Sequence, residues 1–121
     1  MVKYFFDSYA VIEIITGNPS YIKFINEPKI ITIFNLVEIY YSALNNLNEQ
    51  KANEIYEKYS RCIGEISDNI LKEAMKFRKN NKSKNLSYAD CIGYLFALKN
   101  NLIFLTGDKE FTNLKNVEFV K

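Results

Sequence analysis

Four acidic residues lie at the ends or near the starts of apolar segments of this sequence: Asp7, Glu38, Asp90 and Asp108. Two of them directly follow strand-like apolar runs, and the other two lie near the start of apolar helical segments. Carboxylates close to a protein core are costly unless something compensates their charge. A divalent cation with a preference for oxygen ligands is the simplest such compensation, so the pattern predicts a site for Mg²⁺ or Mn²⁺.

Acids of this kind can support phosphodiester hydrolysis, because a metal-bound water has a lowered pKa and can act as the nucleophile. The chain contains no histidine, which excludes histidine acid–base catalysis, a Ser-His-Asp triad and histidine-ligated zinc. Ser8 and Thr106 offer hydroxyls beside two of the acids, either to position water and a carboxylate or simply to cap a helix or turn. Glu110 is a candidate fifth ligand or an outer acid.

Each acid also has a structural interpretation. Residues 35–38 and 87–90 both fit a capping box, with an acid three residues after the capping side chain. Asp7 can serve as the N-cap of the helix that follows it, and Asp108 can belong to a Gly-Asp turn. Four like charges at one edge would nevertheless raise one another's pKa and destabilise the fold, which favours a cation among them.

The rest of the chain is basic. Apart from these four acids the sequence has 16 basic and 10 acidic residues (14 minus four), a balance that suits a polyanionic substrate. A cluster of cations precedes the Asp90 segment, where it would either flank the cleft and contact backbone phosphates or form a solvated helix end. Its members are Lys76, Arg78, Lys79, Lys82 and Lys84.

The elements that must position these residues follow from periodicity and from Pro, Gly and Asn signals. Their alternation predicts one α/β domain over residues 1–121, with a parallel sheet and helices on both faces. The carboxyl ends of the strands would then form the functional crevice and bring the four acids together. The pattern predicts strands at 2–6, 29–34, 102–105 and 117–120, a short strand or connector at 62–66, and helices at 8–16, 19–25, 35–44, 48–59, 68–79 and 88–100.

Cysteine usage and hydropathy bear on location. Cys62 and Cys91 form no CxxC pair, and a chain with this much apolar content needs no disulfide, so reduced thiols in a cytoplasm are expected. We expect no secretory signal and no membrane association, because the charge-free run 30–37 is too short to span a bilayer.

Four short motifs, in their order and spacing, resemble those of the PIN-domain ribonucleases, and most closely the VapC-type toxins of prokaryotic toxin–antitoxin pairs. The resemblance runs from Val2 to about Val120. Asn35 stands where that family often has serine or threonine, and Glu110 where aspartate is frequent. The motifs are Phe6-Asp7-Ser8, Asn35-Leu36-Val37-Glu38, Ser87-Tyr88-Ala89-Asp90 and Thr106-Gly107-Asp108-Lys109-Glu110-Phe111.

The resemblance implies a three-layer α/β/α fold around a central, mainly parallel sheet of four to five strands. It further implies an endoribonuclease that depends on Mg²⁺ or Mn²⁺, with Asp7 and Asp90 as the central metal ligands. Glu38 and Asp108 would complete the acidic pocket. A homodimer and a small cognate antitoxin that covers the cleft are the partners it implies, with RNA as the substrate.

Other functions remain open at this stage. A non-catalytic or processing-type PIN domain that binds RNA or a protein would be expected to lack one of the acids, whereas this chain keeps all four. A phospho-receiver domain needs an acidic pair after the first strand, where this chain has only Asp7. A haloacid-dehalogenase-type phosphatase needs a second aspartate two residues after the first, and Tyr9 occupies that position.

Overall fold

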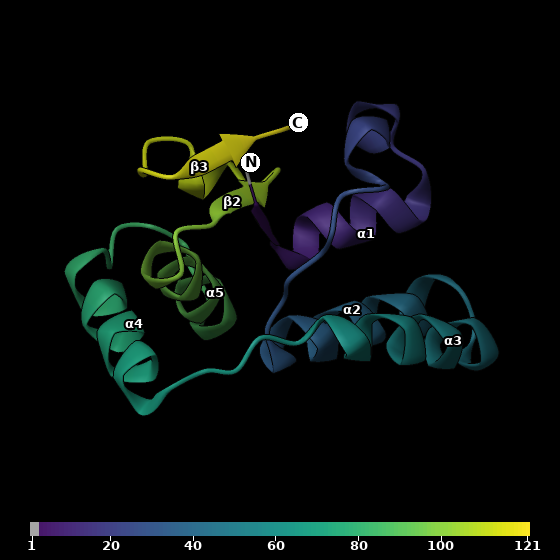
Figure 1. The fold of residues 1–121 in the computed structure, drawn as a ribbon, viewed down its shortest axis with the longest axis horizontal. Helices are drawn as coiled ribbons and strands as arrows, with labels where there is room; N and C mark the ends of the chain where they lie inside the picture. Colours follow the sequence, from purple (N-terminus) through teal and green to yellow (C-terminus); the bar gives the residue numbers. More distant parts are fainter. Residues whose placement is uncertain (1–2) are drawn as a thin grey trace.

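The computed structural model describes residues 3–121 and contains a parallel sheet with helices on both faces (Figure 1). The three strands pair in the order β1 (Tyr4–Phe6), β2 (Ile103–Thr106) and β3 (Val117–Phe119). Isolated parallel bridges extend this sheet beyond β1, through Ile30–Ile31 to Ile63. The predicted α/β/α architecture is therefore confirmed, with three regular strands in place of the four to five expected.

The helices form two groups on opposite sides of the sheet (Figure 1). One group packs α5 between α4 and the sheet, and the other places α1 beside the paired helices α2 and α3. Short 3-10 turns connect several of these elements. The bounds are α1 (Ser8–Thr16), η1 (Pro19–Phe24), α2 (Ile33–Asn46), α3 (Glu49–Tyr59), η2 (Ser60–Cys62), α4 (Asp68–Asn80), α5 (Tyr88–Lys99) and η3 (Lys109–Phe111).

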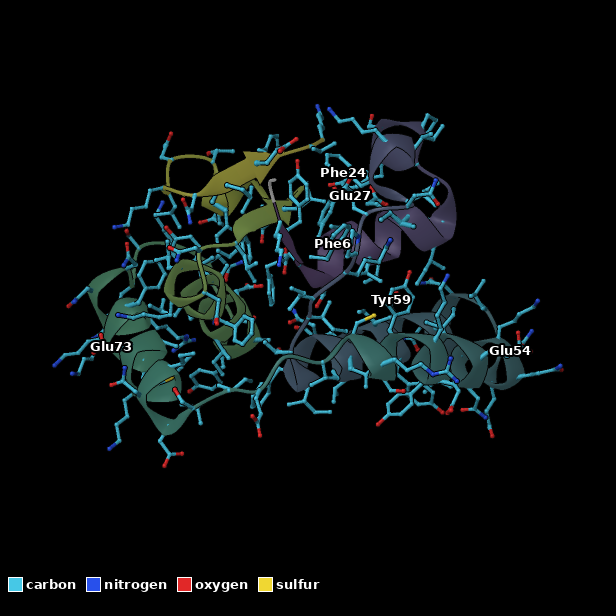
Figure 2. The ribbon with its side chains drawn as sticks, viewed as in Figure 1. Phe6, Phe24, Glu27, Glu54, Tyr59 and Glu73 are labelled. Carbon is cyan, nitrogen blue, oxygen red and sulfur yellow. The ribbon has the colours of Figure 1, made fainter. Side chains whose placement is uncertain are left out.

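Alternating side chains of the central strands supply both cores. Phe5 and its neighbour Phe104 face α4 and α5, and their rings stack at 5.5 Å. Phe6 and Leu105 face the other way, toward the helices of the second group. Figure 2 shows Phe6 on this side, in the region where Tyr59 of α3 approaches the sheet. Because both faces are apolar, polar side chains can gather only at the strand ends.

Helix α5 packs directly against the sheet, as expected from its apolar composition. Seven consecutive residues, 91–97, are buried. Gly93 permits the close approach, because a Cβ atom there would lie 3.0 Å from the ring of Phe5. This packing fixes the first turn of α5, and with it Asp90, at the edge of the sheet.

The predicted strand at 29–34 and the predicted start of a helix at Asn35 are both wrong. Only Ile30 and Ile31 make bridge contacts, and α2 already begins at Ile33 with Thr32 as its N-cap. A short β-branched run does not distinguish a strand from the start of a helix, and here the Thr32 cap decides in favour of the helix. The segment 62–66 is a connector with a single bridge at Ile63, and residues 117–119 form the predicted last strand.

Both cysteines carry free thiols, Cys91 in the core and Cys62 half-buried. Across residues 3–121 no helix has the combination of length and hydropathy that a bilayer crossing requires.

Candidate metal-binding active site

Asp7 occupies the end of β1 and is almost fully buried, with 3% of its surface exposed. Its Oδ1 accepts the backbone N–H of Ser8 at 2.9 Å, which makes Asp7 the N-cap of α1. Its Oδ2 accepts the hydroxyl of Thr106 at 2.7 Å, from the last residue of the neighbouring strand β2. The capping and site interpretations of Asp7 are thus compatible, because both carboxylate oxygens are oriented by short hydrogen bonds.

A buried polar relay connects Asp7's neighbour Ser8 to α2. Asn35 Oδ1 accepts both the backbone N–H and the hydroxyl of Thr32, at 3.0 and 2.7 Å. This fixes the amide of Asn35, whose Nδ2 donates to Ser8 Oγ at 2.9 Å. The hydroxyl of Ser8 in turn donates to Glu38 Oε1 at 2.6 Å. Because Asn35 Oδ1 accepts both bonds from Thr32, the Nδ2 group of Asn35 is the one that faces Ser8 and donates to it. The Ser8 hydroxyl is then free to donate to the carboxylate of Glu38.

Sequence reasoning missed this relay. It treated Asn35 as a cap and gave Thr32 no role, although Thr32 and Asn35 form the capping box of α2. The three-residue spacing of a threonine and an asparagine was the available signal. Glu38 therefore lies in the second turn of α2, and the prediction that it belongs to a capping box is wrong.

Asp90 does belong to a capping box, as predicted. Its Oδ2 accepts the N–H of Ser87 at 2.8 Å, and its own N–H donates to Ser87 Oγ at 3.0 Å. The carboxylate lies in the first turn of α5, where the helix dipole favours negative charge. Its side chain is half-buried and its orientation is fixed by the cap.

The remaining two acids lie in the turn after β2. The N–H of Asp108 donates to Thr106 Oγ1 at 3.0 Å, so one hydroxyl joins the Asp7 and Asp108 segments. Asp108 Oδ1 accepts the N–H of Glu110 at 3.0 Å and caps η3. The side chain of Glu110 is held by the loop before α5, because its Oε1 accepts the N–H of Asn85 at 3.0 Å.

The acids interact through their charges. Burial raises the pKa of Asp7 to about 8, against the Thr106 hydrogen bond, and the charges of Asp90 and Glu38 add to the rise. Burial likewise raises the pKa of Glu38, with Asp90 adding to it and the Ser8 hydroxyl opposing it. The pKa of Asp90 is raised by burial and by Asp108, against its bonds to Ser87. Asp7, Glu38 and Asp90 therefore lie near one another, and Asp108 lies near Asp90.

The donor chemistry of this cluster fits a hard divalent cation. Carboxylate and hydroxyl oxygens are the groups that line it, and the one ion pair among the described residues, Lys76 with Glu73, lies elsewhere on α4. Within residues 3–121 no three acidic, histidine or cysteine side chains are close enough to ligate one ion as they stand. Mg²⁺ commonly takes only one or two carboxylates and keeps several waters, so a site for it does not require three acidic ligands.

The basic cluster 76–84 lies at the end of α4 and in the following loop. Arg78 Nε donates to the Leu86 carbonyl at 3.2 Å, and the guanidinium lies 4.3 Å from the centre of the Tyr88 ring. Lys84 Nζ approaches the Glu110 carbonyl at 3.5 Å, and Lys76 pairs with Glu73 at 3.7 Å. Lys79 and Lys82 are exposed. The segment therefore adjoins the start of α5, and three of its five cations already have partners.

Sequence comparison assigns the family. The model of the PIN domain matches residues 4–117. The chain belongs to the PIN-domain family. In this PIN domain the match covers β1, β2 and the first residue of β3, and it includes the four acids. No curated protein sequence matches the chain.

Solved structures with the same fold include toxins and toxin–antitoxin complexes. VapC20 of Mycobacterium tuberculosis, a toxin that cleaves the sarcin–ricin loop, has a TM-score of 0.80 at 12% identity, covering 98% of this chain and 100% of its own. A toxin–antitoxin complex from Klebsiella pneumoniae has a TM-score of 0.75 at 20% identity, covering 96% of each chain. VapBC2 of Rickettsia felis, bound to a promoter DNA fragment, has a TM-score of 0.71 at 16% identity and full coverage of both chains. These similarities confirm the fold.

Proposed function

We propose that this PIN domain is an endoribonuclease that depends on Mg²⁺ or Mn²⁺ and acts as the toxin of a toxin–antitoxin pair. The observation that carries the proposal is the grouping of Asp7, Glu38 and Asp90 at the carboxyl edge of the sheet, where the charge of Asp90 raises the pKa of both Asp7 and Glu38. The cluster lies in a family and a fold in which solved neighbours include an RNA-cleaving toxin. The two free cysteines agree with a cytoplasmic location, which is part of the proposal.

Each group has a defined task in this proposal. Asp7 and Asp90 hold the divalent ion, with Glu38 and Asp108 completing the negative pocket. When bound, the ion supplies charge compensation and a water of lowered pKa. Ser8 and Asn35 keep Glu38 oriented, and Thr106 holds Asp7 and the Asp108 turn in register. Glu110 acts as an outer acid that fixes the loop before α5, because it accepts the Asn85 N–H.

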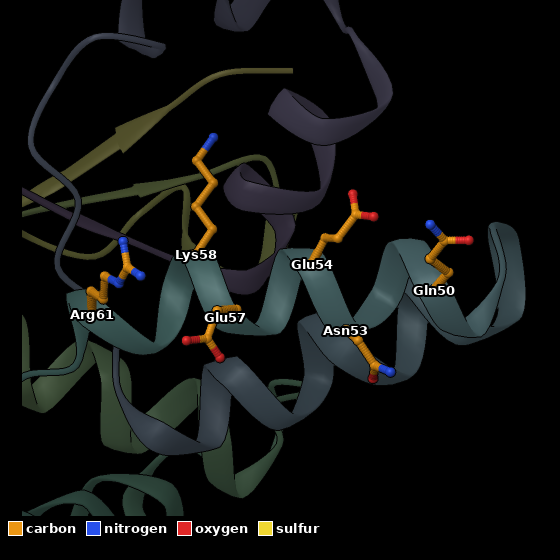
Figure 3. A pocket seen from close by; sticks show the side chains of 6 residues that line it. All are labelled: Gln50, Asn53, Glu54, Glu57, Lys58 and Arg61. Carbon is orange, nitrogen blue, oxygen red and sulfur yellow. The ribbon is translucent and has the colours of Figure 1, made fainter.

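A cleavage assay on total RNA tests the proposal. The purified protein should cut RNA with added Mn²⁺ or Mg²⁺ and lose this activity with a chelator, and Asp90→Asn should be inactive. Glu54→Gln is the matched control, since it also removes one negative charge but lies on the exposed side of α3 (Figure 3). If the wild type cleaves no RNA and binds no divalent ion at millimolar concentration, the non-catalytic alternative replaces this proposal.

The basic cluster is proposed to contact the RNA backbone. Replacing Lys79, Lys82 and Lys84 with Gln should weaken RNA binding. It should also make the affinity depend less steeply on salt concentration, because up to roughly three phosphate contacts are lost. Mapping the cut ends in the same experiment would identify the sequence context. An unchanged salt slope would show that these cations are only solvated.

The proposed antitoxin has a suitable surface beside the site. The outward face of α2 carries Ile33, Val37, Tyr41 and Leu44, which are 44, 59, 67 and 39% exposed. Their spacing forms one apolar stripe on the helix that also carries Glu38, so a partner lying on it reaches the acidic pocket. An apolar antitoxin segment is the occupant we propose, in keeping with the antitoxin complexes among the structural neighbours.

Co-expression with any small reading frame found beside this gene would test this partner. Val37→Ser and Tyr41→Ser should weaken complex formation without reducing the cleavage rate, because both side chains are exposed and the substitutions add no charge beside Glu38. The proposal also includes a homodimer, which sedimentation of the isolated protein would reveal. A complex that survives both substitutions would assign the antitoxin to another face.

A further inference from the structure

A hollow at the amino ends of the strands lies at the edge of the sheet opposite the acids. It has a volume of about 460 Å³, and its wall includes Lys3, which precedes β1, whereas Asp7 follows the same strand. We propose that this hollow binds a phosphate group, either of a free nucleotide or of an RNA chain. The proposal does not depend on the nuclease activity.

The charged residues that line the hollow are all positive. Lys3, Lys29 and Arg61 line it, and no aspartate or glutamate does. Lys58 lies near Lys29 but does not line the hollow: burial lowers the pKa of Lys29, the charge of Lys58 adds to this effect, and Cys62 and Glu27 oppose it. None of these four cations takes part in an ion pair with a carboxylate among the described residues. A hollow lined by cations and by no carboxylate favours an anionic ligand.

Lys29, one of the three cations that line the hollow, is held by backbone carbonyls. Lys29 Nζ donates to the carbonyls of Ile25 and Glu27 at 2.6 and 3.1 Å, and to that of Phe24 at 3.4 Å. Its three donors are therefore used, and it contributes a fixed positive charge. Lys3 and Arg61 are exposed side chains that also line the hollow, so they can supply the hydrogen bonds. A guanidinium can bind a phosphate through two parallel bonds, which suits Arg61 to this role.

The floor of the hollow is apolar and closely packed. Phe96 and Leu102 are buried beneath it, 5% exposed each. Gly64 forms part of the wall, where a Cβ atom would lie 2.4 Å from the Phe96 ring, so only glycine fits. The volume lies within the roughly 300–1,000 Å³ range of small-molecule sites. A phosphate at the cationic rim with a nucleoside over the floor matches this combination.

The adjoining hollow on α3 differs in its charge. It has a volume of about 610 Å³ and shares Arg61 (Figure 3). In Figure 3, Lys58 and Arg61 extend from the same side of the helix, whereas Glu57 points away from them. This second hollow mixes acids and cations, so it offers no comparable preference for anions. Its lining consists of Gln50, Asn53, Glu54, Glu57, Lys58 and Arg61.

Binding of two probes to the intact chain tests the proposal. Calorimetry with ADP, and fluorescence anisotropy with a short single-stranded RNA in the presence of a chelator, should each be run on the wild type and on Lys3→Gln/Arg61→Gln. We expect the double variant to lose at least tenfold in affinity for one of the probes. The matched control is Lys51→Gln/Lys72→Gln, which removes two exposed cations from α3 and α4.

The result also identifies the source of the phosphate. A loss confined to ADP assigns the hollow to free nucleotides, and a loss confined to RNA assigns it to the RNA backbone. Because Lys3 and Arg61 are exposed, their replacement should leave the circular dichroism spectrum unchanged. The proposal would be overturned if the wild type bound neither probe. It would also be overturned if the pocket variant and the control variant lost equal affinity.

Discussion

Removing the buried charge of Asp7 should stabilise this protein in the absence of metal. Asp7→Asn keeps the shape of the side chain and the acceptor for the Ser8 N–H, and Thr106 Oγ1 can accept from the new amide instead of donating. The acid itself carries a cost, since burial raises its pKa from 3.8 to about 8. Folding therefore favours the protonated acid, and ionisation at neutral pH opposes it.

The sign and size follow from proton linkage. Between pH 3.8 and about 8 the folded state binds a proton that the unfolded state releases, so the stability contributed by Asp7 is complete below this window and is lost as pH rises through it. At 1.36 kcal/mol for each pKa unit, the 4.2 units between pH 3.8 and 8 set a ceiling of about 6 kcal/mol. Asp7→Asn should recover about 1–3 kcal/mol of it at pH 8, because the Thr106 hydroxyl loses its charged acceptor.

Urea unfolding with a chelator, measured at pH 5 and pH 8, would show the effect. The variant should exceed the wild type in free energy of unfolding at pH 8, and the difference should shrink at pH 5. Added Mg²⁺ or Mn²⁺ should reverse the order, since an ion at a hundred times its Kd stabilises only the wild type, by about 2.7 kcal/mol. Glu54→Gln should show neither change. Equal stabilisation of Asp7→Asn by the metal would refute Asp7 as a ligand.

Three further substitutions test the packing that positions the site. Phe104→Ala should cost about 3–5 kcal/mol of unfolding free energy, because the ring is fully buried against Phe5, whereas exposed Tyr41→Ala should change it by less than about 0.5 kcal/mol. Asn35→Ala should cost about 2–4 kcal/mol in thermal or urea unfolding, since it leaves two donors of the buried Thr32 without an acceptor. Gly93→Val should separate α5 from the sheet and reduce both stability and metal affinity in calorimetry, and unchanged values would show that the contact is not needed.

Much of the site could be predicted because its determinants are local. Asp7 directly follows β1, Asp108 lies two residues after the end of β2, and the capping box of Ser87 and Asp90 is a short-range signal that the structure confirms. Asn48 likewise begins α3 where the amphipathic stripe predicts it. In each case the hydrogen bonds that define the element lie within three or four residues, so the sequence alone carries the information.

The boundary before α2 could not be predicted in this way. Residues 29–34 have strand propensity, and both Thr32 and Asn35 are good N-caps. Tertiary contact makes the choice, because the amide of Asn35 is buried and needed by Ser8, which leaves the cap to Thr32. The same contact moves Glu38 out of the first turn and into the acidic cluster.

The sequence by itself determined the alternation of strands and helices, the family motifs and the presence of four acids at element ends. The pKa values of those acids depend on the tertiary structure. Thr106, 99 residues away, orients Asp7, and the core around β1 buries it, so that its pKa rises and the neighbouring acids reinforce the shift. Desolvation and charge coupling depend on distances across the fold, and residue types and spacing do not specify those distances.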